Sequence, residues 1–166
     1  MIPFRQKLFL KILADQTTLD TVVPEALLHA IYLLKHSEKD EQDIFTQEHE
    51  IKFVSLLTNL GNGQNLEYQA IFLHFTGPVF NSSFNAIYQN IFKISKENLA
   101  NPALSPATEV QAKFNLAFLY QNKLGLPNDE NTSPLLNNQA FTYYKFSADA
   151  GHFLAQFYFA KIYEDY

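Results

Sequence analysis

Two stretches near the end of the chain decide the fold: Ala112-Lys-Phe-Asn-Leu-Ala-Phe-Leu-Tyr120 and Ala155-Gln-Phe-Tyr-Phe-Ala-Lys-Ile-Tyr163. They agree at four positions, each pair 43 residues apart: Ala112 with Ala155, Phe114 with Phe157, Ala117 with Ala160, and Tyr120 with Tyr163. A fixed offset of this size is typical of stacked helical hairpins. The alanine in the middle of each stretch lets a neighbouring helix approach closely, and the tyrosine fills the space beside it. The sequence therefore predicts a helical repeat in this region.

The residues between the two stretches complete one repeat unit. Gly125 suits a left-handed or tight-turn position. Ser133-Pro134 suits an N-cap followed by a first helical turn. Ala140 to Ala148 then carry a helical pattern, which Gly151 ends as a residue just past the helix.

This order of small and aromatic residues resembles the Sel-one-like repeat, a relative of the tetratricopeptide repeat. The matching residues are Ala112, Leu116, Tyr120, Gly125, Leu126, Asp129, Ala140, Tyr143, Tyr144, Ala148, Gly151 and Ala155. Ala117 and Ala160 replace the usual glycine, Lys123 replaces the first loop glycine, and the connection after Asp129 is longer than in the family. The resemblance covers 112–166. It implies an interaction or adaptor role, as in bacterial signalling, cell-envelope or host-interaction complexes or in eukaryotic protein quality control.

Helical periodicity also dominates upstream, with apolar stripes that glycine and proline separate. The stripes are Phe4 to Leu13, Leu27 to Leu34, Phe53 to Leu60, Leu66 to Leu73 and Phe84 to Phe92, and no sustained strand alternation is found. We predict an all-α fold of antiparallel helical hairpins, stacked as a short right-handed tetratricopeptide-like α-solenoid of about 7–8 helices. We expect a single domain over 1–166, with an irregular helical part in 1–63, a degenerate hairpin in 64–111, and in 112–166 the repeat plus the first helix of a next one.

Composition narrows the functional class. The chain has no Cys, a formal net charge of −5 and 12 Lys and Arg residues without a cluster, whereas nucleic-acid binders usually carry a basic patch. No apolar stretch is long enough for a membrane span or a signal segment. We therefore expect a soluble, cytoplasmic protein that binds no nucleic acid. Its richness in Asn, Lys, Phe and Ile suggests an AT-rich, bacterial genome, and delivery into a host cell as an effector or its partner is compatible with this.

The usual catalytic motifs are missing from the sequence. His49-Glu50 lacks a second histidine at zinc-binding spacing, because Phe53 occupies that position. Gly61 and Gly63 lack the third glycine of a dinucleotide loop, where Leu66 stands. No phosphate-binding loop and no Gly-x-Ser-x-Gly elbow occur. We predict that the protein is not an enzyme and uses no cofactor and no metal.

A face of the first repeat helix that is not used for packing is expected to line a groove for a protein or peptide partner. In 112–122 this face carries Asn115, Phe118 and Asn122. The 43-residue offset and the upstream pattern extend the predicted groove to Tyr158, Lys161, Tyr68 and Phe75. Amides can pair with a peptide backbone and rings can anchor its side chains. The competing interpretation is that Phe118 packs under another helix.

The sequence is also compatible with two other functional hypotheses. A small-ligand-binding or enzymatic helical domain would use a pocket around His29, His74 and Tyr88, and it predicts a deep polar cavity with a perturbed histidine. A structural subunit would form an obligate homo-oligomer through its C-terminal helix. Phe157 and Phe159 on that helix would then form an uncovered aromatic association face.

Overall fold

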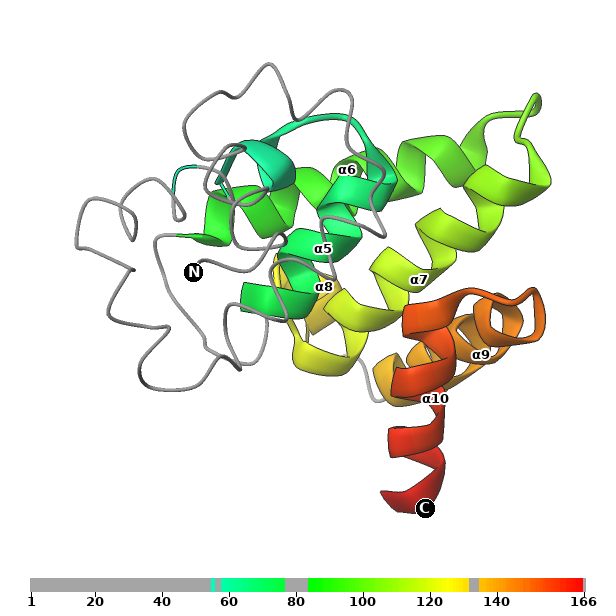
Figure 1. Cartoon of the computed structure of the whole chain (residues 1–166). Helices are drawn as coiled ribbons and strands as arrows, with labels where there is room; N and C mark the ends of the chain where they lie inside the picture. Colours follow the sequence, from blue (N-terminus) through cyan, green and yellow to red (C-terminus); the bar gives the residue numbers. More distant parts are fainter. Residues whose placement is uncertain (1–54, 56–57, 77–83, 132–134, 166) are drawn as a thin grey trace, which may run out of the picture. The chain divides into compact units, whose positions relative to one another are not determined.

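The computed structural model describes Ser55 and residues 58–76, 84–131 and 135–165. The chain divides into two compact units, Met1–Asn59 and Leu60–Tyr166, and the described residues of the second form six helices from Leu66 onward, coloured from green to red in Figure 1. They are α5 (Leu66–Thr76), α6 (Asn85–Ala100), α7 (Pro106–Asn122), α8 (Asn128–Asn131), α9 (Leu136–Asp149) and α10 (Phe153–Asp165). The described residues contain no strand, which confirms the all-α prediction for this part of the chain. The predicted helices before residue 55, with His29, lie outside the described residues.

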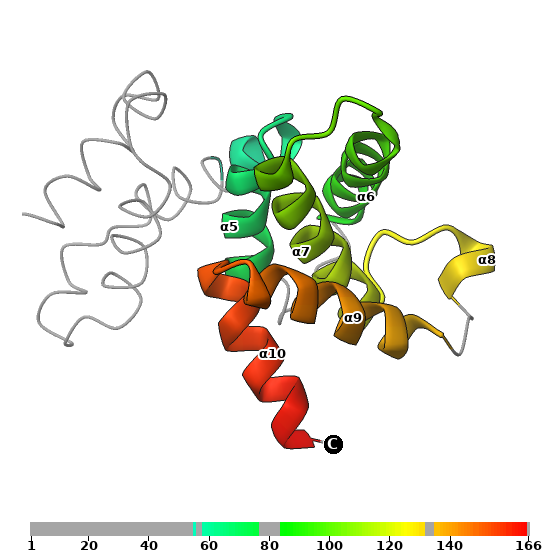
Figure 2. The ribbon, with the colours of Figure 1, turned by 90° about the vertical axis from the view of Figure 1, so that its right-hand side faces the viewer.

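Helix α7 is the centre of the second unit, with α5, α6 and α9 packed around it (Figure 2). It begins as the sequence suggests, because the Ser105 hydroxyl accepts a hydrogen bond from the Thr108 amide at 3.2 Å and Pro106 takes the first position. It ends at Lys123, whose φ of 55° is left-handed. Apart from Lys113, every side chain from Gln111 to Tyr120 is buried. The middle of α7 is therefore covered on nearly every side, as is typical of a helix at the centre of a domain.

Helices α5 and α6 both pack against α7, and they lie within 64–111, where the sequence predicts a degenerate hairpin. The apolar stripe of α5, exemplified by Ala70 and Leu73, is buried. Asn65 caps this helix by accepting hydrogen bonds from two amides of its first turn. The buried Tyr88 of α6 donates its hydroxyl to Thr76 of α5 at 3.2 Å. Apolar packing and the Tyr88–Thr76 hydrogen bond therefore hold the two helices together, although Gln69 Oε1 of α5 and Ser95 Oγ of α6 are buried without a hydrogen-bond partner.

Helices α7 and α9 form the antiparallel hairpin that the repeat pattern predicts. The Tyr144 hydroxyl donates to Gln121 Oε1 at 2.7 Å, and the Ser147 hydroxyl donates to the Val110 carbonyl at 2.7 Å. Four residues of α7 that the repeat comparison in the sequence singles out are all buried: Ala112, Leu116, Ala117 and Tyr120. The hairpin is thus confirmed as a packed pair, while its stacking into a longer solenoid stays a prediction.

The two glycines of the repeat lie where the sequence places them. Gly125 has a φ of 67° and Gly151 a φ of 90°. Gly151 follows α9, and the amide of the next residue, His152, donates back to the Ser147 carbonyl at 3.0 Å. This arrangement is a Schellman helix end, in which glycine avoids the steric cost of a left-handed backbone.

The connection between α7 and α9 differs from the prediction in one respect. Asparagine and proline in the stretch from Asn128 to Pro134 predict a turn or loop, but Asn128–Asn131 form the single turn α8. Pro127 precedes this turn, and Asp129 and Glu130 lie within it, where acidic residues favour the start of a helix. The predicted cap at Ser133 lies outside the described residues.

Candidate functional site

Helix α10 has one covered face and one open face. Its covered side chains are Leu154, Ala155, Tyr158 and Ile162. On the open face Phe153 is 70% exposed, Phe157 48% and Tyr163 68%. The C-terminal end of the helix projects past α9 in both ribbon views (Figures 1 and 2). Three exposed aromatic rings on four turns of helix are unusual for a surface without a partner.

Tyr158 anchors the covered face to three other helices. Its hydroxyl shares a 2.7 Å hydrogen bond with Nδ1 of His74 on α5. Its ring lies 5.2 Å from that of Phe118 on α7, edge to face, and 5.9 Å from that of Tyr144 on α9, nearly parallel. Burial raises the pKa of Tyr158 to about 12, so the hydroxyl keeps its proton at neutral pH. The open face of α10 is therefore presented from a firmly packed helix.

His152 fixes the start of α10. Its Nδ1 accepts a hydrogen bond from the Ala155 amide at 3.1 Å, so the proton of the neutral ring is on Nε2, which donates to Gln111 Oε1 at 2.9 Å. Gln111 donates in turn to Asn115 at 3.3 Å, and Asn115 donates to the Leu66 carbonyl at 3.0 Å. This chain of hydrogen bonds runs from α10 through α7 to α5.

We expect acid to destabilise the fold through His152. Burial lowers the pKa of its ring to about 4, from an ordinary value of 6.5. Between these two values the unfolded chain binds more protons than the folded one, so this contribution to stability is complete above pH 6.5 and is lost as the pH falls toward 4. Because the ring is partly exposed, we expect a loss of about 2 kcal/mol between pH 7 and pH 4.

The measurement is the free energy of urea unfolding from pH 7 to pH 4 for the natural chain and for His152→Asn. Asparagine is a good N-cap residue and does not titrate. The difference between the two curves removes the contribution of carboxyl groups that titrate in the same range. If the two curves run parallel, His152 is not the source of the acid sensitivity.

The residues predicted to line a groove lie in different environments. Asn115 is 0% exposed, Phe118 1% and Tyr158 9%, and they are held inside by the contacts described above. Phe118 thus packs under another helix, which is the competing interpretation from the sequence. Asn122 and Lys161 are exposed, and the Lys161 ammonium lies 5.3 Å from the centre of the Phe157 ring.

Tyr68 and Phe75 on α5 are half-buried. The Tyr68 amide donates to Asn65, and the Phe75 ring lies 4.9 Å from that of His74. The predicted set therefore does not form one continuous open surface, and binding of a partner by its exposed members stays a prediction. Sequence reasoning did not select Phe153 or Tyr163. The 43-residue offset pairs them with Val110 and Tyr120 of α7, but it does not show that their face of α10 is open.

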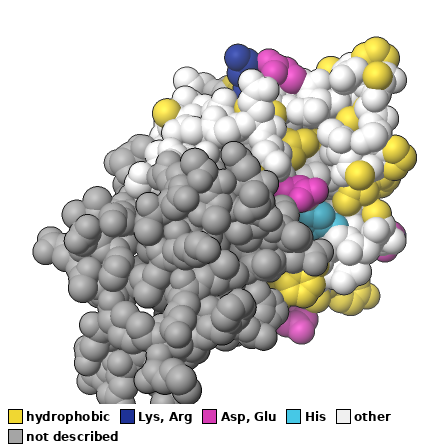
Figure 3. All heavy atoms as spheres, turned by 45° about the horizontal axis from the view of Figure 1, so that its top comes forward, with side chains coloured by type: hydrophobic (Ala, Val, Ile, Leu, Met, Phe, Trp, Pro, Cys, Tyr) yellow, Lys and Arg dark blue, Asp and Glu magenta, His cyan; other side chains and the backbone are white. Residues whose placement is uncertain are grey.

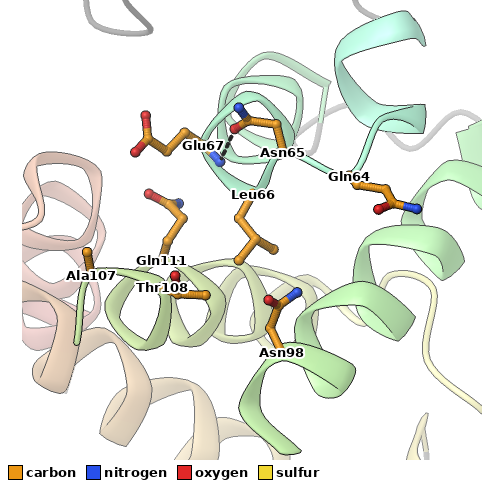
Figure 4. Close-up of a pocket in the computed structure, with 8 residues that line it drawn as sticks. All are labelled: Gln64, Asn65, Leu66, Glu67, Asn98, Ala107, Thr108 and Gln111. Atoms are coloured by element: carbon orange, nitrogen blue, oxygen red, sulfur yellow. Dashed lines mark hydrogen bonds between the residues drawn. The ribbon is translucent and has the colours of Figure 1, made fainter. Parts of the chain in front are cut away.

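A polar pocket of about 270 Å³ lies where the first turns of α5 and α7 meet the end of α6 (Figure 4). It is lined mainly by amide and hydroxyl groups: Gln64, Asn65, Asn98, Thr108 and Gln111, with Leu66, Glu67 and Ala107. Neither His74 nor Tyr88 lines it. Asn65, Thr108 and Gln111 of its lining already take part in hydrogen bonds within the fold.

Charged side chains are few and scattered on the face shown in Figure 3. Within the described part of the chain, no three His, Asp or Glu side chains are grouped in a way that could hold a metal ion. Nor does any helix among the described residues have the length and apolar character needed to cross a membrane.

Comparisons with protein-family models, with curated proteins and with solved structures found no match to this chain. Its function must therefore be argued from its own geometry.

Proposed function

We propose that this protein is a helical scaffold that binds a partner protein through the open face of α10, and that it is not an enzyme. The observation that carries the proposal is the exposure of Phe153, Phe157 and Tyr163 on one packed helix. Exposed aromatic rings are the side chains most often found as energetic anchors of protein interfaces. The resemblance to the Sel-one-like repeat supports the same class of role and a solenoid arrangement of the hairpins.

The position of the open face adds to this argument. Tyr158 and the His152 cap hold α10 on the other helices, so its outer side chains need little ordering when a partner binds. Interfaces that are ordered in advance lose less conformational entropy on binding. Lys161 lies beside Phe157 and gives the patch a polar edge, as binding surfaces usually have.

The alternative of a catalytic or small-ligand pocket has less support. His74 shares its Nδ1 with the Tyr158 hydroxyl, and the Tyr88 hydroxyl is bonded to Thr76. In the part of the chain that the structure describes, both side chains join neighbouring helices: His74 links α5 to α10, and Tyr88 links α6 to α5. A homo-oligomer would use the same open face, so sedimentation of the purified chain distinguishes a partner protein from a second copy.

We expect loss of partner binding when the patch is removed. A photo-crosslinking amino acid in place of Phe157, expressed in the native cell, should give a specific adduct. The same group in place of Leu135, which is 59% exposed at the start of α9, should give none. Truncating a central anchor costs about 2 kcal/mol, so Phe157→Ser should weaken binding of the crosslinked partner about 30-fold.

Folding is the control for this experiment. Because about half of the Phe157 ring is covered and the ring lies 5.2 Å from that of Tyr158, its replacement by serine should lower the unfolding free energy by about 1–2 kcal/mol, so binding is measured where circular dichroism shows the variant to be folded. An unchanged affinity in the folded Phe157→Ser variant, or equal adducts from Leu135 and Phe157, would refute the proposed function.

A further inference from the structure

The internal repeat relates the open face of α10 to a face of α7 that is covered. Hydrogen bonds, ring contacts and a cation–π contact join α9 to these residues of α7: Val110, Lys113, Phe114, Tyr120 and Gln121. Adding the 43-residue offset gives their counterparts on α10: Phe153, Gln156, Phe157, Tyr163 and Glu164. All five counterparts are exposed. The face that α9 covers on α7 is therefore the face that is open on α10.

The alanine in the middle of this face is also covered on α7 and open on α10. Ala117 of α7 is 0% exposed, whereas its counterpart Ala160 is exposed. Ala160 lies between Phe157 and Tyr163 on one side of the helix, since residues three positions apart are neighbours. A small residue between two rings allows another helix to approach closely and lets the rings pack on either side of it.

The polar groups of the α7–α9 contact also have equivalents on α10. Gln121 accepts the hydroxyl of Tyr144, and its counterpart Glu164 carries a carboxylate that can accept a hydroxyl in the same way. The Val110 carbonyl accepts the hydroxyl of Ser147, and Phe153 offers a backbone carbonyl at the equivalent place. A helix with the tyrosine and serine of α9 would find acceptors for both.

We propose that the partner of α10 is an amphipathic helix of another protein, which packs on α10 as α9 packs on α7. It presents a small residue, a pair of aromatic residues and a serine or threonine at the spacing of Ala140, Tyr143, Tyr144 and Ser147. The proposal rests on the proposed function and specifies it, because it states the kind of partner. A second copy of this chain is the other occupant that the test can reveal.

The test asks whether an α9-like helix covers the open face. A second copy of residues 124–151 is appended to the full chain after Tyr166, which is the counterpart of Lys123 by the same offset. The chain has no Cys, so Phe157→Cys introduces a single thiol whose reaction with a maleimide reports exposure. We expect the thiol to react at least about tenfold more slowly in the extended chain, because tethering gives the added helix a high effective concentration.

Two controls accompany the measurement. Leu135→Cys, on a different surface, should react equally fast in both chains. Replacing Tyr143 and Tyr144 by serine in the appended copy alone should restore fast labelling at position 157. Should the Phe157→Cys variant of the extended chain fail to fold, as judged by circular dichroism, Ala160→Cys takes its place on the same face.

Equal labelling rates in the extended and the original chain would overturn this inference. Slow labelling already in the original chain, together with a dimer in sedimentation, would overturn it in favour of a second copy as the occupant. If labelling is unchanged by the extension while the crosslinks from position 157 persist, the proposed function stands and only the kind of partner is wrong.

Discussion

Gly125→Ala should destabilise the second unit by about 3 kcal/mol, through strain and overpacking together. A β-carbon at this position would lie 2.6 Å from the backbone nitrogen of Gln89 and 2.6 Å from the carbonyl oxygen of Tyr88, and would also meet the Tyr88 carbonyl carbon. These atoms belong to the backbone of α6, which cannot move aside as a side chain can. The φ of 67° adds a cost for any residue with a β-carbon.

Gly151→Ala is the matched control for this prediction. Its φ of 90° is also left-handed, but a β-carbon there would have no neighbour within 4 Å. We expect this variant to lose only about 1 kcal/mol, and the difference between the two variants measures the collision with α6. Urea unfolding followed by circular dichroism gives both values. Equal losses would show that the close contact between the 123–127 loop and α6 does not constrain the fold.

The two glycines show which features could be predicted from the sequence. A glycine at the end of a helical pattern predicts a left-handed backbone, and both residues have one. The close approach of Gly125 to α6 could not be predicted, because it depends on how helices that are distant in sequence pack. Local backbone geometry is readable from neighbours in the chain, whereas contacts between helices depend on the whole fold.

The same distinction explains the predicted groove. Periodicity shows which residues share a face of a helix, but it does not show how many faces are covered. The run from Phe114 to Tyr120 contains only one polar residue, Asn115, and such a run is typical of a helix that is buried all round. On this criterion, the apolar run predicts that Asn115 and Phe118 are buried. Their partners, Leu66 and Tyr158, are too distant in sequence for a pattern to pair them.

The open face of α10 illustrates the opposite case. Phe153, Phe157 and Tyr163 are residue types that usually lie in a core, and Phe157 has the same place in its helix as the buried Phe114. From the sequence alone, Phe114 and Phe157 would be predicted to be buried to the same extent. Only the structure shows that α9 covers one of them, while the described residues leave the other half exposed.

Phe118→Ala should destabilise the protein by about 3–4 kcal/mol, whereas Asn122→Ala should cost less than about 1 kcal/mol. The two residues were assigned to one face from their spacing, yet Phe118 is 1% exposed and Asn122 is exposed. Removing a buried phenylalanine ring leaves a cavity and costs about 3–5 kcal/mol. Asn122→Ala removes one hydrogen bond, from the Asn122 side chain to the Phe118 carbonyl at 2.9 Å, and an exposed side chain can exchange such a bond for one to water, so its net contribution is small.

Phe118→Leu separates the cavity from the chemistry of the ring. Leucine fills most of the space, so this variant should lose less than about 1.5 kcal/mol, with the edge-to-face contact to Tyr158 accounting for part of that loss. Urea unfolding of the three variants gives the order Phe118→Ala, Phe118→Leu, Asn122→Ala from largest loss to smallest. A Phe118→Ala variant that kept its stability but lost its partner would place Phe118 at the interface after all, and α10 would then have to move away from α7 when the partner binds.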